Sequence, residues 1–114
     1  MRVAHTYACV MNIISSKEEL LSMQKLHKHV ICIFSAEWCR PCQNLKADLK
    51  DFTNETTDIA WAMVDVDKAE LMCSQYNVQQ IPRVLFYKGE DKHGDLHGPS
   101  GKDVIETAKK NGFM

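Results

Sequence analysis

Two cysteines separated by two residues, Cys39 and Cys42, are the side chains of this sequence best suited to do chemistry. Such a pair can close a small disulfide ring and open it again, which is a two-electron exchange. The pair follows an apolar, strand-like run at residues 30–34 and precedes a segment with helical periodicity. Cys39 is therefore expected at a helix N-terminus, where unpaired backbone N–H groups and the helix dipole favour the thiolate that attacks disulfides. The spacing predicts thiol–disulfide chemistry.

The neighbouring residues predict different roles for the two cysteines. Trp38 and Arg40 are expected to leave Cys39 at the protein surface as the attacking thiol, and the charge of Arg40 favours its thiolate. Cys42 lies one turn into the helix, so we expect it to be more buried and to resolve the mixed disulfide by attacking Cys39. Pro41 restrains the loop and has no N–H to donate to a sulfur.

Half of a zinc site is the main alternative for a Cys-x-x-Cys pair, followed by an inert structural pair. A structural zinc site normally needs four Cys or His ligands, usually in two close pairs. No second Cys-x-x-Cys is present, and the pairs His27/His29 and His93/His97 lie in polar segments. We therefore expect redox chemistry, with no metal and no cofactor.

Length and composition place the cysteine pair in one domain. The 114 residues, 45% hydrophobic and 25% charged, suffice for a single core but not for two. A formal net charge of -1 gives no reason to expect nucleic acid as a partner. No apolar run approaches the roughly 20 residues that span a bilayer, so no membrane association is expected. Because five cysteines with one close pair are a poor match to a secreted disulfide framework, and no secretory signal is recognised, we expect a cytoplasmic protein.

The three remaining cysteines are expected to be structural. Cys32 lies inside the apolar run and is expected to be a small buried hydrophobe. Cys73 lies on a predicted helix, and Cys9 lies in or before the first predicted strand, and an accessory thiol is the alternative to a structural role for both.

Strands and helices alternate along residues 9–114, behind an N-terminal extension at residues 1–8. Ser16 and Glu19 predict a helix capping box, and Leu71 and Met72 are expected to face inward from a short helix. Strands are expected at residues 9–14, 30–36, 59–66, 84–87 and 94–98, and helices at residues 16–28, 41–54, 68–76 and 100–112. The alternation predicts an α/β fold with helices on both faces of a central sheet. A short turn at residues 88–91 predicts that the last two strands pair antiparallel, which makes the sheet mixed.

Three motifs in this order resemble the thioredoxin family over about residues 10–112. They are Ala36-Glu37-Trp38-Cys39-Arg40-Pro41-Cys42, the strand end Val64-Asp65-Val66-Asp67, and Ile81-Pro82. The resemblance implies a thioredoxin-like fold for residues 9–114 and the activity of a protein-disulfide oxidoreductase. It implies that Cys39 is the nucleophile and Cys42 the resolving cysteine. It also implies disulfide-containing protein substrates and a thioredoxin reductase or another dithiol reductant as partners.

The resemblance further implies a substrate site. Pro82 stands at the position of the family's cis-proline, which lies against the active-site disulfide. The backbone of Ile81 would then pair with an extended substrate segment, and Trp38 would shield the site. Arg83, where the family frequently has Thr, is expected to add a positive charge at the substrate groove.

Three other positions depart from the family's pattern. Arg40 replaces a common Gly, Ile33 stands where a buried Asp is common, and Met63 replaces a lysine often found near that Asp. We therefore expect the usual internal proton acceptor of Cys42 to be absent. Resolution would then be slower, or water or a substrate group would take the proton.

Two other functions stay open on the sequence. One is a thioredoxin-like binding module that holds a partner without turnover. The other is a disulfide oxidant or isomerase, because Arg40 and the loss of the buried acid both bear on the redox poise.

Overall fold

The apolar run before the cysteine pair forms the central strand of a five-stranded sheet in the computed structural model, which describes residues 11–114. This strand, β2 (His29–Ser35), pairs parallel with β3 (Ile59–Asp65) and antiparallel with β4 (Arg83–Lys88). β1 (Met11–Ile14) flanks β3, and β5 (Asp91–His97) flanks β4, so the strand order is β1-β3-β2-β4-β5. Residues 30–34 are completely buried, as expected for a strand covered on both faces. The predicted extension at residues 1–8 and Cys9 lie outside the described residues.

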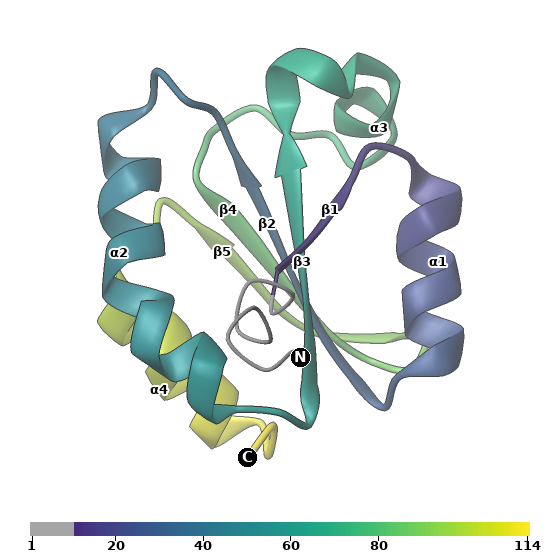
Figure 1. Cartoon of the computed structure of the whole chain (residues 1–114). Helices are drawn as coiled ribbons and strands as arrows, with labels where there is room; N and C mark the ends of the chain where they lie inside the picture. The colour runs from purple at the N-terminus through teal and green to yellow at the C-terminus, as the bar shows by residue number, and fades with distance from the viewer. Residues whose placement is uncertain (1–10) are drawn as a thin grey trace, which may run out of the picture.

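Helices cover both faces of this sheet (Figure 1). α2 (Arg40–Glu55) and α4 (Gly101–Lys110) pack on one face, and α1 (Lys17–Leu26) and α3 (Glu70–Gln75) pack on the other. The side chains of successive residues in β2 point to opposite faces of the sheet. Ile31 and Ile33 pack in the core under α2 and α4, whereas Cys32 packs in the core under α1 and α3. The predicted fold class, a mixed sheet between two helical layers, is confirmed. Within residues 11–114, none of the helices is both long and apolar enough to cross a membrane.

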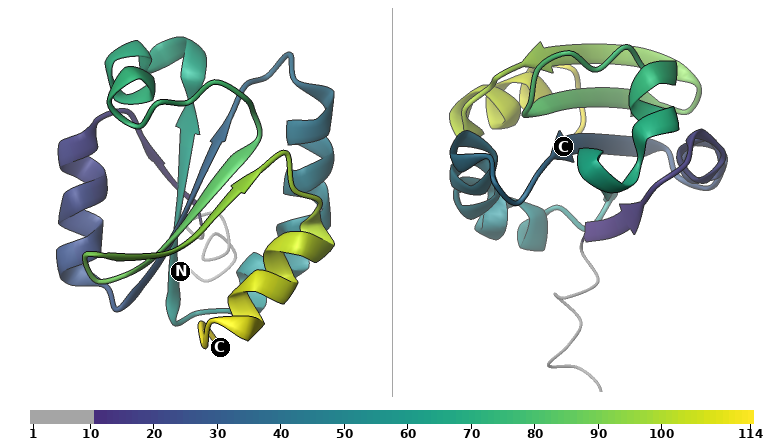
Figure 2. Two further views of the ribbon diagram at one scale, coloured as in Figure 1. Left: turned by 180° about the vertical axis from the view of Figure 1, so that it is seen from behind. Right: turned by 90° about the horizontal axis from the view of Figure 1, so that it is seen from above.

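The last two strands form an antiparallel hairpin, as predicted, but the hairpin is longer than expected (Figure 2). β5 begins at Asp91, three residues before the expected edge strand at residues 94–98. Gly89 has a φ of 61°, a conformation open to glycine, so the turn closes at once and pairing starts directly after it. A register shift between Phe86 and Tyr87 lets the pairing continue. The first residues of β5 are exposed and polar, so no apolar alternation marks them in the sequence.

The helix predicted at residues 68–76 is divided into a 3-10 helix, Val66–Lys68, and the short helix α3. Met72 is buried as expected, but Leu71 is 73% exposed, so the expectation that both face inward is wrong for Leu71. Successive helical residues point about 100° apart, and a helix of this length presents only one of them to the sheet.

The first helix is capped by the predicted Ser16, and the last helix, expected to start at Ser100 or Gly101, begins at Gly101 with Ser100 as its N-cap. Ser16 accepts a hydrogen bond from the Glu19 N–H (3.2 Å), whereas the Glu19 carboxylate accepts the N–H of Ser15 (2.9 Å), so half of the predicted box forms at Ser16. A complete capping box forms at the start of α4, between Ser100 and Asp103.

Candidate active site at the start of helix α2

Cys39 and Cys42 form a disulfide at the N-terminus of α2. Cys39 is the N-cap residue, and its Sγ accepts a hydrogen bond from the backbone N–H of Cys42 (N···S 3.3 Å). The loop before it is held by Ala36, whose carbonyl accepts the Cys39 N–H (3.2 Å) and the Gln43 side-chain amide (2.8 Å). The sulfur of Cys39 thus lies at a helix end, where N–H groups and the dipole stabilise negative charge.

The two cysteines differ in accessibility. Cys42 is completely buried, and Cys39 is 5% exposed, so their order is as predicted. The exposure of Cys39 is nevertheless smaller than we expected of a residue at the surface. Ala36 is buried with the pair, and Val66 and Ile81 pack against the three residues. The small exposed part of Cys39 therefore lies in an opening beside these side chains.

Trp38 lies at the surface next to this opening and is 69% exposed. Its indole Nε1–H donates to Oδ2 of Asp67 (2.8 Å), in the 3-10 helix after β3. Asp67 in turn donates its backbone N–H to Oδ1 of Asp65 (3.0 Å). Sequence reasoning missed Asp67 as a site residue. The signal available was an acid two residues after the end of β3, the strand that pairs with β2.

The peptide bond between Ile81 and Pro82 is cis, as the family resemblance implied. Because β4 runs antiparallel to β2, the start of β4 lies beside the end of β2, where the cysteine loop begins. Pro82 is buried, and Ile81 is half-buried against the cysteine pair. The sheet topology therefore brings residues 81–82 to the disulfide although about forty positions separate them in the sequence.

A groove of about 310 Å³ opens beside the pair. Its walls come from the cysteine loop, the 3-10 helix, α3 and the loop after α3, and include Trp38, Val66, Glu70, Cys73, Val78 and Ile81. Sequence reasoning placed only Trp38 and Ile81 here, since no local pattern unites residues from four segments. Burial, followed by the charges of Asp67 and Glu70, raises the pKa of the Cys73 thiol. Cys73 is thus kept protonated rather than activated.

Comparison with known proteins agrees with this geometry. The family model of thioredoxin matches residues 13–111. This chain belongs to the thioredoxin family. It is 36% identical over 80 residues to Thioredoxin-1 of Caenorhabditis elegans, covering 70% of each chain, and 29% identical over 98 residues to Thioredoxin-3 of Dictyostelium discoideum, covering 86% of this chain and 93% of the relative.

Solved thioredoxin structures share the fold. Oxidized mitochondrial Thioredoxin 3 of Saccharomyces cerevisiae superposes with a TM-score of 0.82 at 19% identity, covering 91% of this chain and 97% of that one. The thioredoxin of Fasciola hepatica gives a TM-score of 0.79 at 25% identity, covering 89% and 99%. The protein is accordingly a disulfide oxidoreductase of the thioredoxin family, and Cys39 and Cys42 are its dithiol pair.

Arg83, expected as a free charge at the groove of this thioredoxin-family protein, has a different environment. Its guanidinium pairs with the Asp95 carboxylate through Nε–Oδ1 (3.0 Å) and Nη2–Oδ2 (2.8 Å). Nη1 donates to the carbonyls of Tyr76 (2.6 Å) and Asn77 (3.1 Å). Hydrogen bonding to Arg83 lowers the pKa of Asp95 to about 2. Arg83 is only 7% exposed, and its charge is used in an ion pair within the protein rather than presented at the groove. The reason is that Asp95 lies next to it on the neighbouring strand β5.

Arg40 and Pro41 are the first two residues of α2, and both are exposed. None of the ion pairs within residues 11–114 involves Arg40. Its positive charge therefore remains uncompensated beside Cys39. Pro41 occupies the first turn, where its missing N–H costs no helical hydrogen bond.

The positions at which the family commonly has a buried acid and a lysine are apolar here. Ile33 and Met63 face each other in the parallel β2–β3 register, and Ile33 is completely buried with Leu45 and Leu49 of α2. Met63 Sδ accepts the hydroxyl hydrogen of Ser35 (3.1 Å). The side chains at positions 33 and 63 therefore provide neither a base nor a cation in the core under α2.

The other described cysteines do not join the pair. Cys32 is a free thiol that is completely buried, and burial raises its pKa, which confirms the expected role of a small hydrophobe. Among residues 11–114, no three His, Cys, Asp or Glu side chains gather as metal ligands would.

Proposed function

We propose that this thioredoxin-family protein reduces protein disulfides, with Cys39 as the attacking cysteine and Cys42 as the resolving one. The observation that carries the assignment is the difference between the two sulfurs. Cys39 is the N-cap, receives the Cys42 N–H and retains some exposure, whereas Cys42 retains none. Only Cys39 therefore combines access to a substrate with stabilisation of a thiolate.

The reaction consists of two successive thiol–disulfide exchanges. The Cys39 thiolate attacks one sulfur of the substrate disulfide, and the other substrate sulfur leaves as a thiolate and takes up a proton. Cys42 then loses its proton and attacks Sγ of Cys39, releasing the second substrate sulfur as a thiolate. The substrate gains two electrons and two protons, and the protein is left with the Cys39–Cys42 disulfide.

The groove beside Cys39 suits an extended substrate segment. Within residues 11–114, Ile81 takes part in no described backbone hydrogen bond, so its N–H and carbonyl are available for strand addition. Trp38 offers an exposed apolar face on the other side of the opening. Pro82 holds the loop between them, and we assign Arg83 to bracing that loop rather than to contacting substrate.

A dithiol reductant, such as a thioredoxin reductase, would return the pair to the reduced state. We propose a reducing compartment such as the cytoplasm, because Cys32 and Cys73 both remain free thiols. Reduction by NADPH and thioredoxin reductase, compared with reduction by glutathione, tests the identity of the reductant.

The test of the assignment is mechanism-based trapping with an insulin-like disulfide substrate. Cys42→Ser should accumulate a mixed disulfide through Cys39, and Cys39→Ser should lose both activity and trapping. Cys32→Ala, a change outside both the pair and the groove, should behave like the parent protein. Equal trapping by both pair variants on mass spectrometry would contradict the roles.

The same assay separates the two alternative functions. A parent protein that fails to accelerate insulin reduction by dithiothreitol, while Cys39 remains modifiable, would be a binding module. A pair that oxidises dithiol peptides in preference to reducing disulfides would be an oxidant or isomerase. The redox potential of the Cys39–Cys42 pair, measured against glutathione, distinguishes an oxidant or isomerase from a reductase.

A further inference from the structure

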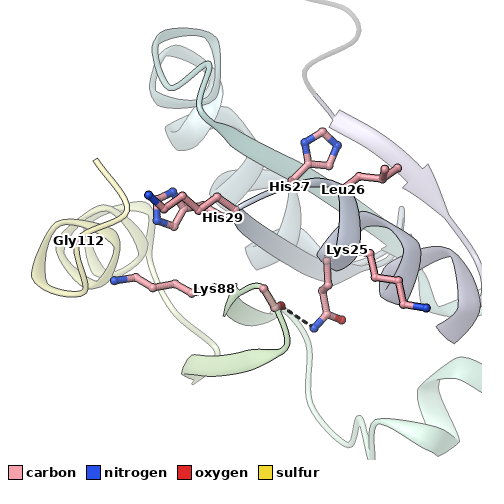
Figure 3. Close-up of a pocket in the computed structure, with 9 residues that line it drawn as sticks. Lys25, Leu26, His27, His29, Lys88 and Gly112 are labelled. Atoms are coloured by element: carbon pink, nitrogen blue, oxygen red, sulfur yellow. Dashed lines mark hydrogen bonds between the residues drawn. The ribbon is translucent and has the colours of Figure 1, made fainter.

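A second cavity lies at the end of the sheet opposite the cysteines. It occupies about 600 Å³ where α1 ends, β2 begins, β4 turns into β5 and α4 ends (Figure 3). This volume lies within the roughly 300–1,000 Å³ typical of small-molecule sites. β2 starts at this cavity and ends at the cysteine loop, and its seven residues at about 3.3 Å each separate the two by roughly 20 Å. The cavity is therefore distinct from the active site.

The lining of this cavity is basic and contains no acidic side chain. Five of its nine residues are Lys or His: Lys25, His27, Lys28, His29 and Lys88. Lys25 lies in the last turn of α1, where it compensates the helix dipole. Lys28 follows that helix in a loop and Lys88 ends a strand, so neither is explained by a helix end. None of the ion pairs described for residues 11–114 involves these five.

Two of the basic side chains, His29 and Lys88, lie on the same side of the cavity. Figure 3 shows His29 and Lys88 extending toward the end of α4 at Gly112, while Lys25 and His27 point elsewhere. The His29 ring lies 4.8 Å from the ring of Phe113, and Lys88 Nζ lies 5.8 Å from the centre of that same ring. A histidine and a lysine from different strands therefore approach one buried aromatic side chain.

The repulsion within this group is not offset by a neighbouring acid of the lining. The pKa of His29 is lowered by burial first, then by the charges of Lys88 and Lys28, and Asp58 alone opposes the change. A bound anion would relieve this repulsion, since opposite charge favours the protonated imidazole.

The cavity is also braced before any ligand arrives. The Gln24 side-chain amide donates to the carbonyl of Gly89 (3.0 Å), and the Gly89 N–H donates to the carbonyl of Lys28 (3.1 Å). These two hydrogen bonds join the end of α1 and the following loop to the β4–β5 turn. Little ordering of the backbone is then required on binding.

We propose that this cavity binds a phosphorylated small molecule, with Lys28, His29 and Lys88 contacting its phosphate groups. Ammonium groups bind phosphate as point charges, and a protonated imidazole adds a directed N–H donor. A formal net charge of -1 gives the chain no general attraction for large polyanions. Attraction for phosphate therefore comes from the basic side chains of the cavity, which suits a ligand small enough to enter it. The site is independent of the cysteine chemistry.

The test uses the full chain with inorganic pyrophosphate as the probe. Binding is measured by calorimetry, and the His29 ring resonance is followed by NMR across pH. Pyrophosphate should raise the His29 pKa, so affinity should increase as the pH falls through the pKa of the bound state. The other titratable groups near His29 that contribute to the electrostatic potential at its ring are Lys25, His27, Lys28, Lys88 and Asp58.

Lys28→Gln and Lys88→Gln should each weaken pyrophosphate binding by about tenfold, the loss expected for one charge-assisted contact. Lys102→Gln makes an equal change of charge in the first turn of α4, at the opposite end of that helix from the cavity. It should leave the affinity within about twofold, because salt screens a surface charge over the length of the helix. All three variants should retain disulfide reductase activity. An unchanged His29 titration at millimolar pyrophosphate, or an equal loss in Lys102→Gln, would overturn the proposal.

Discussion

Arg83 and Asp95 form a bidentate ion pair that joins the start of β4 to the edge strand β5, with N···O distances of 3.0 and 2.8 Å. The two residues are diagonal neighbours, since Arg83 lies opposite His97 and Asp95 lies opposite Leu85 in the hairpin register. The same guanidinium binds the carbonyls at the end of α3. The loop that follows α3 carries one wall of the groove beside Cys39, so this ion pair connects the groove to the sheet.

Replacing Arg83 with Thr should destabilise the protein and loosen the groove. The change removes the buried donor of two carbonyls and of a carboxylate that keeps only partly exposed partners, and we expect a loss of roughly 2–4 kcal/mol in the free energy of unfolding. KM for a protein disulfide should rise more than kcat falls, because the change affects the loop that we propose binds substrate and leaves the cysteines in place. Urea unfolding and steady-state kinetics measure the two effects.

Lys92→Gln is the matched control for this change. Lys92 pairs with the same carboxylate (3.0 Å), but its side chain is 49% exposed, so its removal should cost less than about 1 kcal/mol. Comparable losses in the Arg83 and Lys92 variants would show that burial of the guanidinium is unimportant.

The acid stability of the protein should depend on Asp95. Its hydrogen bonds with Arg83, followed by that with Lys92, lower the pKa from its usual value near 3.8 to about 2. A lowered carboxyl pKa stabilises the folded state above the unfolded-state pKa, and that contribution disappears as the pH falls from about 4 to 2. The shift corresponds to about 2 kcal/mol.

Urea unfolding between pH 2 and about 6 would measure this contribution in the parent protein and in Asp95→Asn. The parent should lose stability over the acid range, and the variant should be less stable at neutral pH with a flatter profile. Parallel profiles for the two proteins would assign the acid sensitivity to other carboxylates.

Arg40→Gly should make the cysteine pair more reducing. Arg40 is exposed at the first position of α2, next to the N-cap sulfur, and its charge favours the Cys39 thiolate in the reduced protein. Without it the reduced state loses stability relative to the disulfide. The equilibrium constant with glutathione should shift by less than about tenfold, because water screens a surface charge. A shift toward a more oxidising pair would contradict the reasoning.

Ile33→Asp tests whether the missing acid limits resolution. The carboxyl would replace a completely buried side chain and should cost a few kcal/mol of stability, about 2–5, since little compensates its desolvation. Burial raises the pKa of such a carboxyl, which brings it closer to that of a useful base at neutral pH. In single-turnover kinetics, the attack of Cys42 on the mixed disulfide should become faster although the variant is less stable.

Ile33→Asn supplies the control, because an amide is similarly polar but accepts no proton at neutral pH. It should be destabilised to a similar degree and show no acceleration. If a folded Ile33→Asp variant resolves the mixed disulfide no faster than Ile33→Asn, the protein uses another proton acceptor.

The sequence by itself determined those features whose causes lie within a few residues of one another. Cys39 and Cys42 are one helical turn apart, so their chemistry and their order of burial followed from local spacing. The apolar run of β2 predicted a central strand for the same reason, since residues buried on both faces must be continuously apolar. Serines at helix starts likewise marked α1 and α4, because a cap bonds to an N–H three residues away.

Only the tertiary structure decided which distant side chains meet. Arg83 had no visible partner in the sequence, because Asp95 reaches it through a hairpin whose first residues lack a strand pattern. Leu71 and Met72 are equally apolar, yet the direction in which α3 packs exposes one and buries the other. The groove at Trp38 and the basic cavity at Lys88 each combine segments far apart in the chain. Their physical basis is strand order and register, which bring side chains together at a sheet end irrespective of their separation in sequence.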